Sequence, residues 1–354
     1  MTDKNATIET VALYDNLGKL AENHILFGHQ AATEYGRGWQ GDDDRSDVKE
    51  SVGSHPAVVG HDFQFFTFTN QSDSLITAEQ NRLSKLISEQ YNRGGVITMA
   101  WHFPNPVAGN SFYWDENSIP AVPAIIPGGS HHEVYKLILK RIADFAEMPK
   151  GAKGEAVPMI FRPYHELDGD WFWWGKSYCT ADEYKQLWQF TVSYLRDTLN
   201  VHNFIYAFSP DCKFTTEAEY LERYPGDEWV DMVGVDNYHD FGRDADGSLE
   251  AGISDLKIVS DFALKHNKLA AFTETGLESI PNTAWWTNTL LSALKASGGQ
   301  FCYVLVWRND SESPTHYYAS PAGHPSQANF VEFYNNPFTL FTNDLQEIYE
   351  LKDK

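Results

Sequence analysis

Eight short apolar segments recur along this chain, and a stretch with the pattern of an amphipathic helix separates each one from the next. The segments are rich in β-branched and aromatic residues and are almost continuously apolar. Strands of a parallel sheet have this character when helices cover both faces of the sheet. The eight segments are residues 25–30, 57–63, 95–102, 157–166, 203–210, 232–238, 269–276 and 301–309.

Eight strand-then-helix units predict an α/β fold, a (β/α)8 TIM barrel. An open, doubly wound sheet is the alternative, but no G-x-G-x-x-G motif follows the first segment. A length of 354 residues suits one barrel, and no linker rich in Pro, Ser or Gly interrupts the chain. We therefore expect residues 1–354 to form a single barrel domain, with segments 103–130 and 310–337 as loops that elaborate its C-terminal face.

Three short motifs predict where helices begin and end. The sequences "SHHE" (130–133) and "TADE" (180–183) both fit the S/T-x-x-E capping box at a helix start. The sequence "NRGG" (92–95) fits a helix that ends at glycine. These motifs fall between the predicted strands, as the barrel requires.

The composition argues against several classes of partner. A formal net charge of −22 would repel phosphate backbones and anionic lipid headgroups, so we expect neither nucleic acid nor a membrane surface as a partner. No apolar run approaches the roughly 20 residues of a membrane span. The three cysteines lie far apart without C-x-x-C spacing, which predicts free thiols and no structural zinc site.

Each of the eight segments ends in polar residues. In a (β/α)8 barrel these C-terminal strand ends share one rim, where the chemistry collects. Glu166 ends the fourth segment and Glu274 the seventh, so we expect the two carboxylates to face one cleft from opposite sides. Paired carboxylates of this kind cleave glycosidic bonds: one protonates the leaving oxygen while the other acts on the anomeric carbon.

Tryptophans are concentrated near the same rim. Indoles stack on the apolar C–H faces of sugar rings, while nearby polar groups bind the hydroxyls. Trp39, beside two glycines after the first strand, is expected to be an exposed indole at a distal subsite. The tryptophans expected at strand ends or in mouth loops are Trp39, Trp101, Trp114, Trp171, Trp173, Trp174 and Trp307. Those expected to pack in or beside helices are Trp188, Trp229, Trp285 and Trp286.

Several of these segments resemble glycoside hydrolase family 26, the β-mannanases. The sequence "RPYHELDGDWFWWG" (162–175) resembles the acid/base segment of that family, and "FTETG" (272–276) resembles its nucleophile segment. The sequence "YPGDEWVDMVGVDNY" (224–238) resembles the stretch that leads into its sixth strand. Shorter matches, "GHQ", "WHFPNP" and "VLVWRND", fall at other strand ends, so the resemblance spans roughly residues 25–310.

The resemblance implies a retaining hydrolase of β-1,4-mannosidic linkages in mannan, galactomannan or manno-oligosaccharides. Glu166 would be the acid/base and Glu274 the nucleophile, with the pKa of Glu166 raised by burial beside Trp171 and by the charge of Glu274. The remaining residues implied near the nucleophile or along the substrate subsites are His102, His165, Trp171, Asp236, Tyr238, Trp307 and Arg308. β-1,3-Xylanases and mixed-linkage β-glucanases occur in the same family and are the alternatives.

Two other classes of function remain as alternatives. Histidines and acids at the strand ends could form the metal centre of a barrel hydrolase, but no H-x-H pair ends the first strand and no H-E-x-x-H occurs, so we predict no metal and no cofactor. A sugar-binding barrel without catalysis would not need both glutamates. Arg162, near the middle of a strand, is expected to be a structural ion-pair partner inside the barrel mouth.

The substrate also predicts a location for the enzyme. Polymeric mannan is made outside cells, so we expect an exported enzyme, extracellular or periplasmic, although no leader peptide precedes the first helix. A cytoplasmic enzyme that trims imported oligosaccharides is the alternative. We expect a monomer.

Overall fold

Eight parallel strands form a closed barrel in chain order, in which the last strand pairs with the first. The computed structural model describes residues 1–109, 111–115 and 118–351. Its barrel strands are β1 (Ile25–Gln30), β4 (Val58–Asp62), β5 (Val96–Ala100), β6 (Met159–Arg162), β7 (Phe204–Phe208), β8 (Met232–Asp236), β9 (Leu269–Thr275) and β10 (Tyr303–Val306). Closure of the sheet confirms the predicted (β/α)8 barrel over the open sheet.

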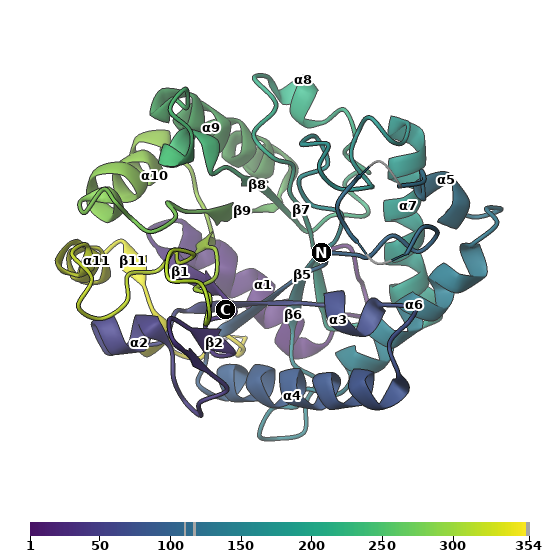
Figure 1. The fold of residues 1–354 in the computed structure, drawn as a ribbon, viewed down its shortest axis with the longest axis horizontal. Coiled ribbons are helices and arrows are strands. Elements are labelled where there is room, and N and C mark those ends of the chain that lie inside the picture. Colours follow the sequence, from purple (N-terminus) through teal and green to yellow (C-terminus); the bar gives the residue numbers. More distant parts are fainter. Residues whose placement is uncertain (110, 116–117, 352–354) are drawn as a thin grey trace.

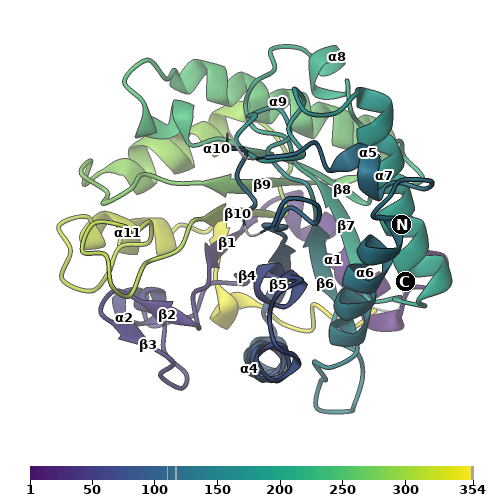
Figure 2. The same ribbon diagram turned by 45° about the vertical axis from the view of Figure 1, so that its right-hand side comes forward.

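Helices surround the strands on all sides (Figures 1 and 2). The α-helices are α1 (Ile8–Ala21), α2 (Asp47–Val52), α3 (Gln64–Thr67), α4 (Asp73–Asn92), α5 (Val122–Ile125), α6 (His132–Ala146), α7 (Ala181–Ser193), α8 (Glu217–Tyr220), α9 (Leu249–His266), α10 (Ser292–Ser297) and α11 (Gln327–Tyr334). Short π- or 3₁₀-helical turns are η1 (Tyr194–Thr198), η2 (His239–Arg243), η3 (Trp286–Leu291) and η4 (Thr342–Asp344). Outside the barrel, β2 (Tyr35–Gly36) and β3 (Trp39–Gln40) form a hairpin, and β11 (Thr339–Leu340) pairs with β1.

Neighbouring residues on one strand pack into two different cores. Leu26 of β1 and Val96 of β5 belong to a cluster inside the barrel, whereas Phe27 and Ile97, one residue further on, pack outward against the helices. The inner cluster contains residues from the beginnings of the strands together with apolar residues of α1, so α1 closes the N-terminal end of the barrel. The polar residues lie at the opposite, C-terminal ends of the strands.

Two of the three predicted helix signals are confirmed. Thr180 caps α7, and Glu183 completes a full capping box. The glycine after α4, Gly94, adopts a left-handed conformation with φ of 85°. The capping box predicted at 130–133 is wrong, because α6 begins only at His132 and the carboxylate of Glu133 pairs with a lysine one turn further on.

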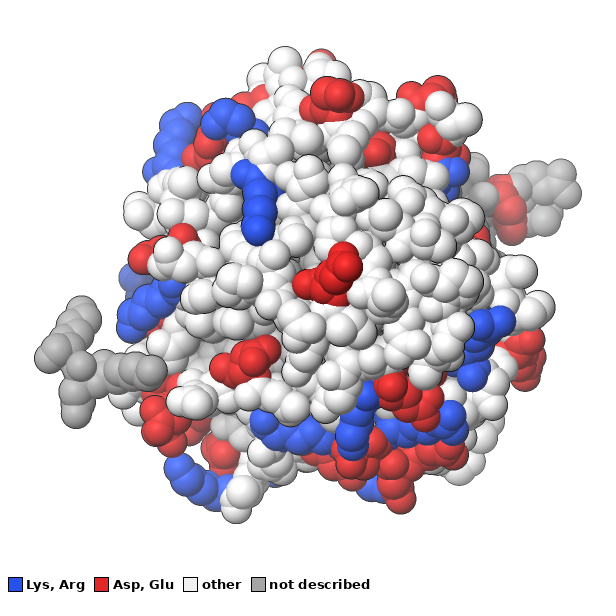
Figure 3. Space-filling model, turned by 90° about the vertical axis from the view of Figure 1, so that its left-hand side faces the viewer, with Lys and Arg blue, Asp and Glu red and all other residues white. Residues whose placement is uncertain are grey.

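Charged side chains are unevenly distributed over the surface. Figure 3 shows a side of the molecule whose middle carries few of them, while acidic and basic side chains interleave along its lower edge. All three cysteines are free, as predicted. Two of them are buried and Cys212 is half-buried. Among the described residues, no helix is both long enough and apolar enough to cross a membrane.

Candidate active site

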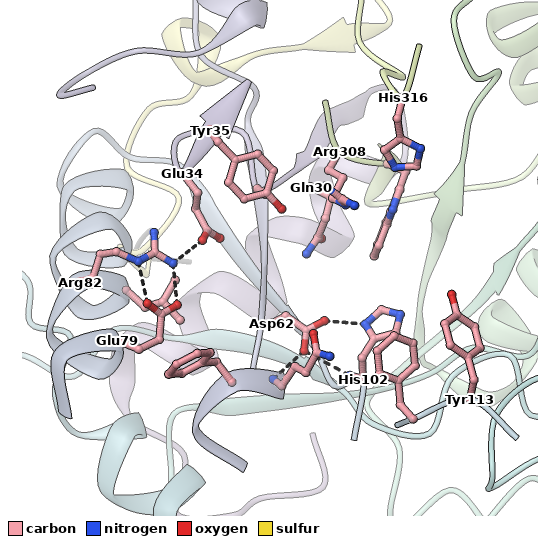
Figure 4. A pocket seen from close by; sticks show the side chains of 16 residues that line it. Gln30, Glu34, Tyr35, Asp62, Glu79, Arg82, His102, Tyr113, Arg308 and His316 are labelled. Carbon is pink, nitrogen blue, oxygen red and sulfur yellow. Dashed lines mark hydrogen bonds and ion pairs between the residues drawn. The ribbon is translucent and has the colours of Figure 1, made fainter. Parts of the chain in front are cut away.

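Two cavities meet at the C-terminal ends of the barrel strands. The first, of about 320 Å³, is called the carboxylate cavity because Glu166 and Glu274 both line it. The second, of about 440 Å³, is called the side pocket and extends past the ends of β1 and β4 toward α4 (Figure 4). The two cavities share four lining residues, which are His102, Tyr113, Trp307 and His316. They therefore form one cleft, and the four shared residues form its waist.

Glu166 is held in position by the irregular backbone that follows β6. The φ angle of Glu166 is 52°, a left-handed conformation that a residue with a side chain adopts at some cost in energy. Its backbone N–H donates to the carbonyl of Ser209 at 2.9 Å. The indole N–H of Trp171 donates to its Oε2 at 2.6 Å, and the residue is only 8% exposed. Backbone and side chain are thus both fixed.

Glu274 lies on β9 in a different electrostatic setting. The Arg162 guanidinium donates to its Oε1, and the Tyr238 hydroxyl donates to its Oε2 at 2.9 Å. A cation and a hydroxyl donor both stabilise the ionised form of a carboxylate. Both contacts of Glu274 therefore favour the ionised form of its carboxyl group.

Among the described residues, no cation makes an ion pair with Glu166. Burial raises its pKa well above the ordinary value for glutamate, and the charges of Glu274, Asp236 and Asp211 raise it further. The hydrogen bond from Trp171 acts in the opposite direction, because it favours the ionised form. The predicted upward shift of the Glu166 pKa and its cause in burial and in the Glu274 charge are confirmed. One cavity thus holds a carboxyl group with a raised pKa beside a second one that contacts a guanidinium and a hydroxyl donor.

Arg162 and Asp236 lie beneath the cleft. Nη1 of Arg162 donates to Oδ2 of Asp236 at 2.6 Å and to the Ser209 hydroxyl at 3.0 Å. This confirms Arg162 as a structural ion-pair partner. The expectation that Asp236 lines the cleft is wrong, because it is fully buried and its other oxygen accepts from the Thr273 hydroxyl at 2.5 Å.

His165 is likewise covered. Its ring nitrogens have no hydrogen-bond partner within the described part of the chain, although the resemblance implies a place for His165 near the nucleophile. Burial and the charge of Arg162 hold the pKa of His165 well below its usual value, so the ring is neutral. Atoms of His165, Asp236 and Glu274 lie within 4.8 Å of one another, a spacing that could hold a metal ion. The Arg162 guanidinium already supplies the positive charge to both carboxylates there.

The tryptophans separate into cleft residues and core residues. Trp171 and Trp307 line the carboxylate cavity, as expected. Trp114 lines neither cavity and stacks on Tyr178, with ring centroids 3.6 Å apart. The exposed indole expected at Trp39 is wrong: it is 5% exposed and its N–H donates to Asp47 at 2.7 Å. The rim tryptophans that prove to be fully buried are Trp101, Trp173 and Trp174, whereas Trp188, Trp285 and Trp286 are core residues as predicted and Trp229 is half-buried.

Other predicted residues reach the cleft, and several lining residues were not predicted. His102 lies at the waist, Tyr238 lines the carboxylate cavity, and Arg308 lines the side pocket. The unpredicted residues of the carboxylate cavity are Tyr113, Phe172, Arg243, His316 and Tyr318. Those of the side pocket include Gln30, Glu34, Tyr35, Asp62, Glu79 and Arg82. Gln30 and Asp62 end strands and so carried a sequence signal, whereas most of the others lie on loops or helices.

A closed (β/α)8 barrel that presents two carboxyl groups in different electrostatic settings to one cleft has the architecture of a glycosidase. Comparison with known proteins defines the family. The model of glycosyl hydrolase family 26 matches residues 2–314, and the chain belongs to this family.

Relatives of known structure match nearly the whole chain. The structure of GH26C from Muricauda sp. MAR_2010_75 has a TM-score of 0.94 and 40% identity, covering 100% of this chain and 96% of that one. A GH26 β-mannanase from Bacteroides ovatus has a TM-score of 0.90 and 41% identity, covering 98% and 99%. A mannan endo-1,4-beta-mannosidase from Bifidobacterium adolescentis is 33% identical over 94% of this chain, which spans about a third (34%) of that longer protein.

Proposed function

We propose that this protein is a retaining β-mannanase that hydrolyses β-1,4-mannosidic linkages in mannan or manno-oligosaccharides. The observation that carries the proposal is the contrast between two carboxyl groups in one cavity: Glu274 in contact with Arg162, and Glu166 buried without a cation. The mannan specificity rests on the relatives, several of which are named as mannanases.

The reaction would proceed in two displacements. Glu274 attacks the anomeric carbon through one carboxylate oxygen, while Glu166 transfers its proton to the glycosidic oxygen and the leaving sugar departs. A water molecule, deprotonated by the now ionised Glu166, then attacks the same carbon and releases Glu274. Two inversions at one carbon return the original anomeric configuration.

Each residue around the two glutamates has a definite task in this scheme. The Tyr238 hydroxyl and Arg162 orient the Glu274 carboxylate from two sides. Trp171 fixes the carboxyl group of Glu166. The indole of Trp307, which lines both cavities, offers an apolar face for a sugar ring at the waist. Because the substrate polymer is extracellular, we further infer that the enzyme acts outside the cytoplasm.

The test combines substrate range with stereochemistry. Purified protein is incubated with mannan, mannohexaose, xylan and lichenan, and proton NMR follows the anomer formed first from mannohexaose. We expect cleavage of the two mannose substrates with release of the β-anomer. Glu166→Ala and Glu274→Ala should each lose at least a thousandfold in kcat on mannohexaose, whereas Glu133→Ala, on the surface of α6, should match the wild type. An α-anomer formed first would exclude the two-step mechanism, and activity only on xylan or lichenan would exclude the mannan assignment.

A further inference from the structure

Asp62, the last residue of β4, makes three polar contacts at the edge of the cleft. Its Oδ1 accepts from the backbone N–H of Gln64 at 2.7 Å and from the backbone N–H of His102 at 3.1 Å. Its Oδ2 lies 2.5 Å from Nδ1 of the His102 imidazole. Asp62 therefore contacts both the main chain and the side chain of one residue on the neighbouring strand end (Figure 4).

A carboxylate at Nδ1 determines which nitrogen of His102 carries the proton. A carboxylate oxygen accepts hydrogen bonds, so Nδ1 must be the donor, and in a ring that carries one proton Nε2 is then an acceptor. The two backbone N–H groups hold Oδ1, which leaves Oδ2 aimed at the ring. The tautomer and the rotation of His102 are thereby set from one side.

Aromatic rings fix the plane of the same imidazole from the other sides. The centroid of the His102 ring lies 4.7 Å from that of His165, 4.9 Å from Phe112 and 5.6 Å from Trp307. His102 also lines both cavities of the cleft. Any chain that extends from the carboxylate cavity into the side pocket must pass this ring.

We propose that Asp62 is a positioning residue for substrate binding: it holds His102 in the Nδ1–H form, so that Nε2 accepts a hydrogen bond from a hydroxyl of the sugar at the waist. The substrate part of this inference rests on the proposed function, whereas the tautomer part does not. Sugar hydroxyls donate as well as accept, so a fixed acceptor at this point selects the orientation of one hydroxyl group.

The chain contains a matched pair that serves as a control. Oδ1 of Asp3 accepts from the backbone N–H two residues on, at 2.8 Å, and its Oδ2 lies 2.8 Å from Nδ1 of His202. The local geometry repeats that of Asp62, but neither residue of this pair lines a cavity of the cleft. Asp3→Asn therefore measures what such a pair contributes to folding alone.

The test uses Asp62→Asn, which keeps the size and the Oδ1 acceptor but turns a donor toward Nδ1. Nitrogen-15 NMR of histidine-labelled protein, with the His102 signals assigned from a His102→Gln variant, should show Nδ1–H in the wild type and Nε2–H in Asp62→Asn. With mannotetraose, kcat/KM should fall about tenfold, mainly through KM. Asp3→Asn should change neither the His102 signals nor KM.

A double-mutant cycle separates positioning from a purely structural role. If Asp62 acts through the His102 ring, Asp62→Asn should have little further effect on KM in the His102→Gln background. Equal losses in both backgrounds, or wild-type His102 tautomers in Asp62→Asn, would overturn the proposal. Should Asp62→Asn not fold, Asp62→Ala is tested in the same cycle. If the wild type is inactive on mannan but His102 has the Nδ1–H tautomer, the proposed function is refuted. The inference that Asp62 sets the tautomer of His102 then still stands.

Discussion

The hydrogen bond from Trp171 to Glu166 predicts how the pH profile responds to one substitution. The indole donates at 2.6 Å to a carboxyl that is only 8% exposed. A hydrogen bond to a buried charged group is worth about 1.5–3 kcal/mol. Because it favours the ionised form of Glu166, its removal must raise the pKa of that carboxyl.

The magnitude follows from the same numbers. One pKa unit corresponds to about 1.4 kcal/mol, so Trp171→Phe should move the ionisation of Glu166 upward by about 1–2 pH units. In the proposed mechanism Glu166 must be protonated in the free enzyme, and its loss of a proton sets the alkaline limb of kcat/KM. We therefore expect that limb to move to higher pH, although the plateau falls because a cleft residue has been shortened.

The assay is kcat/KM on mannohexaose across the pH range in which the enzyme stays folded. Asp211→Asn supplies the opposite sign, because the charge of Asp211 raises the pKa of Glu166 and its removal should move the limb to lower pH. An alkaline limb that stays in place or moves down in Trp171→Phe would refute the argument. Parallel shifts in both variants would show a general loosening of the site instead.

Three further predictions concern stability. Arg162→Met leaves two buried carboxylates without their cation and should lower the free energy of unfolding by about 3–5 kcal/mol in urea denaturation at neutral pH; an unchanged midpoint would contradict the ion-pair role. Trp39→Phe should lower it by about 1–3 kcal/mol without changing KM on any manno-oligosaccharide, because the lost bond is buried; a raised KM would restore a subsite role. Thr180→Ala should cost about 1 kcal/mol whereas Ser130→Ala should cost nothing measurable, and equal losses would contradict the difference in capping.

The strands could be predicted because each one is buried on both sides. All eight predicted segments contain a barrel strand, but the fourth, predicted as 157–166, ends at Arg162. The chain turns there through left-handed residues, with φ of 50° at Tyr164 and 52° at Glu166. Neither is glycine, but Pro163, directly after Arg162, has no backbone N–H to donate and is the local signal that the strand ends there. Tertiary contacts such as the bond from Glu166 to Ser209 hold this backbone in place.

That the two glutamates line the cleft could be predicted from their positions at strand ends. Whether other residues line the cleft or are buried beneath it could not be predicted. Asp236 also ends a strand, yet it binds Arg162 beneath the cleft. A strand-end carboxylate can line the cleft, as Glu274 does, or lie beneath it, as Asp236 does, and the sequence does not show which. The prediction for Trp39 was wrong for the same reason. The acceptor of its indole N–H is Asp47, eight residues away on α2, and the indole is buried. Loop residues such as His316 carried no periodic pattern at all.

The roles proposed for the two glutamates are supported by the placement of a single cation. Arg162 contacts Glu274 and Asp236 but does not contact Glu166. Where several carboxyl groups share one buried region, the proton resides on the group that gains least from ionisation. Burial and the charges of the other carboxylates raise the pKa of Glu166, and among the described residues no guanidinium or ammonium group contacts it. In the proposed mechanism, the assignment of acid and nucleophile would therefore depend on the arginine beneath the cleft, which contacts Glu274 and not Glu166.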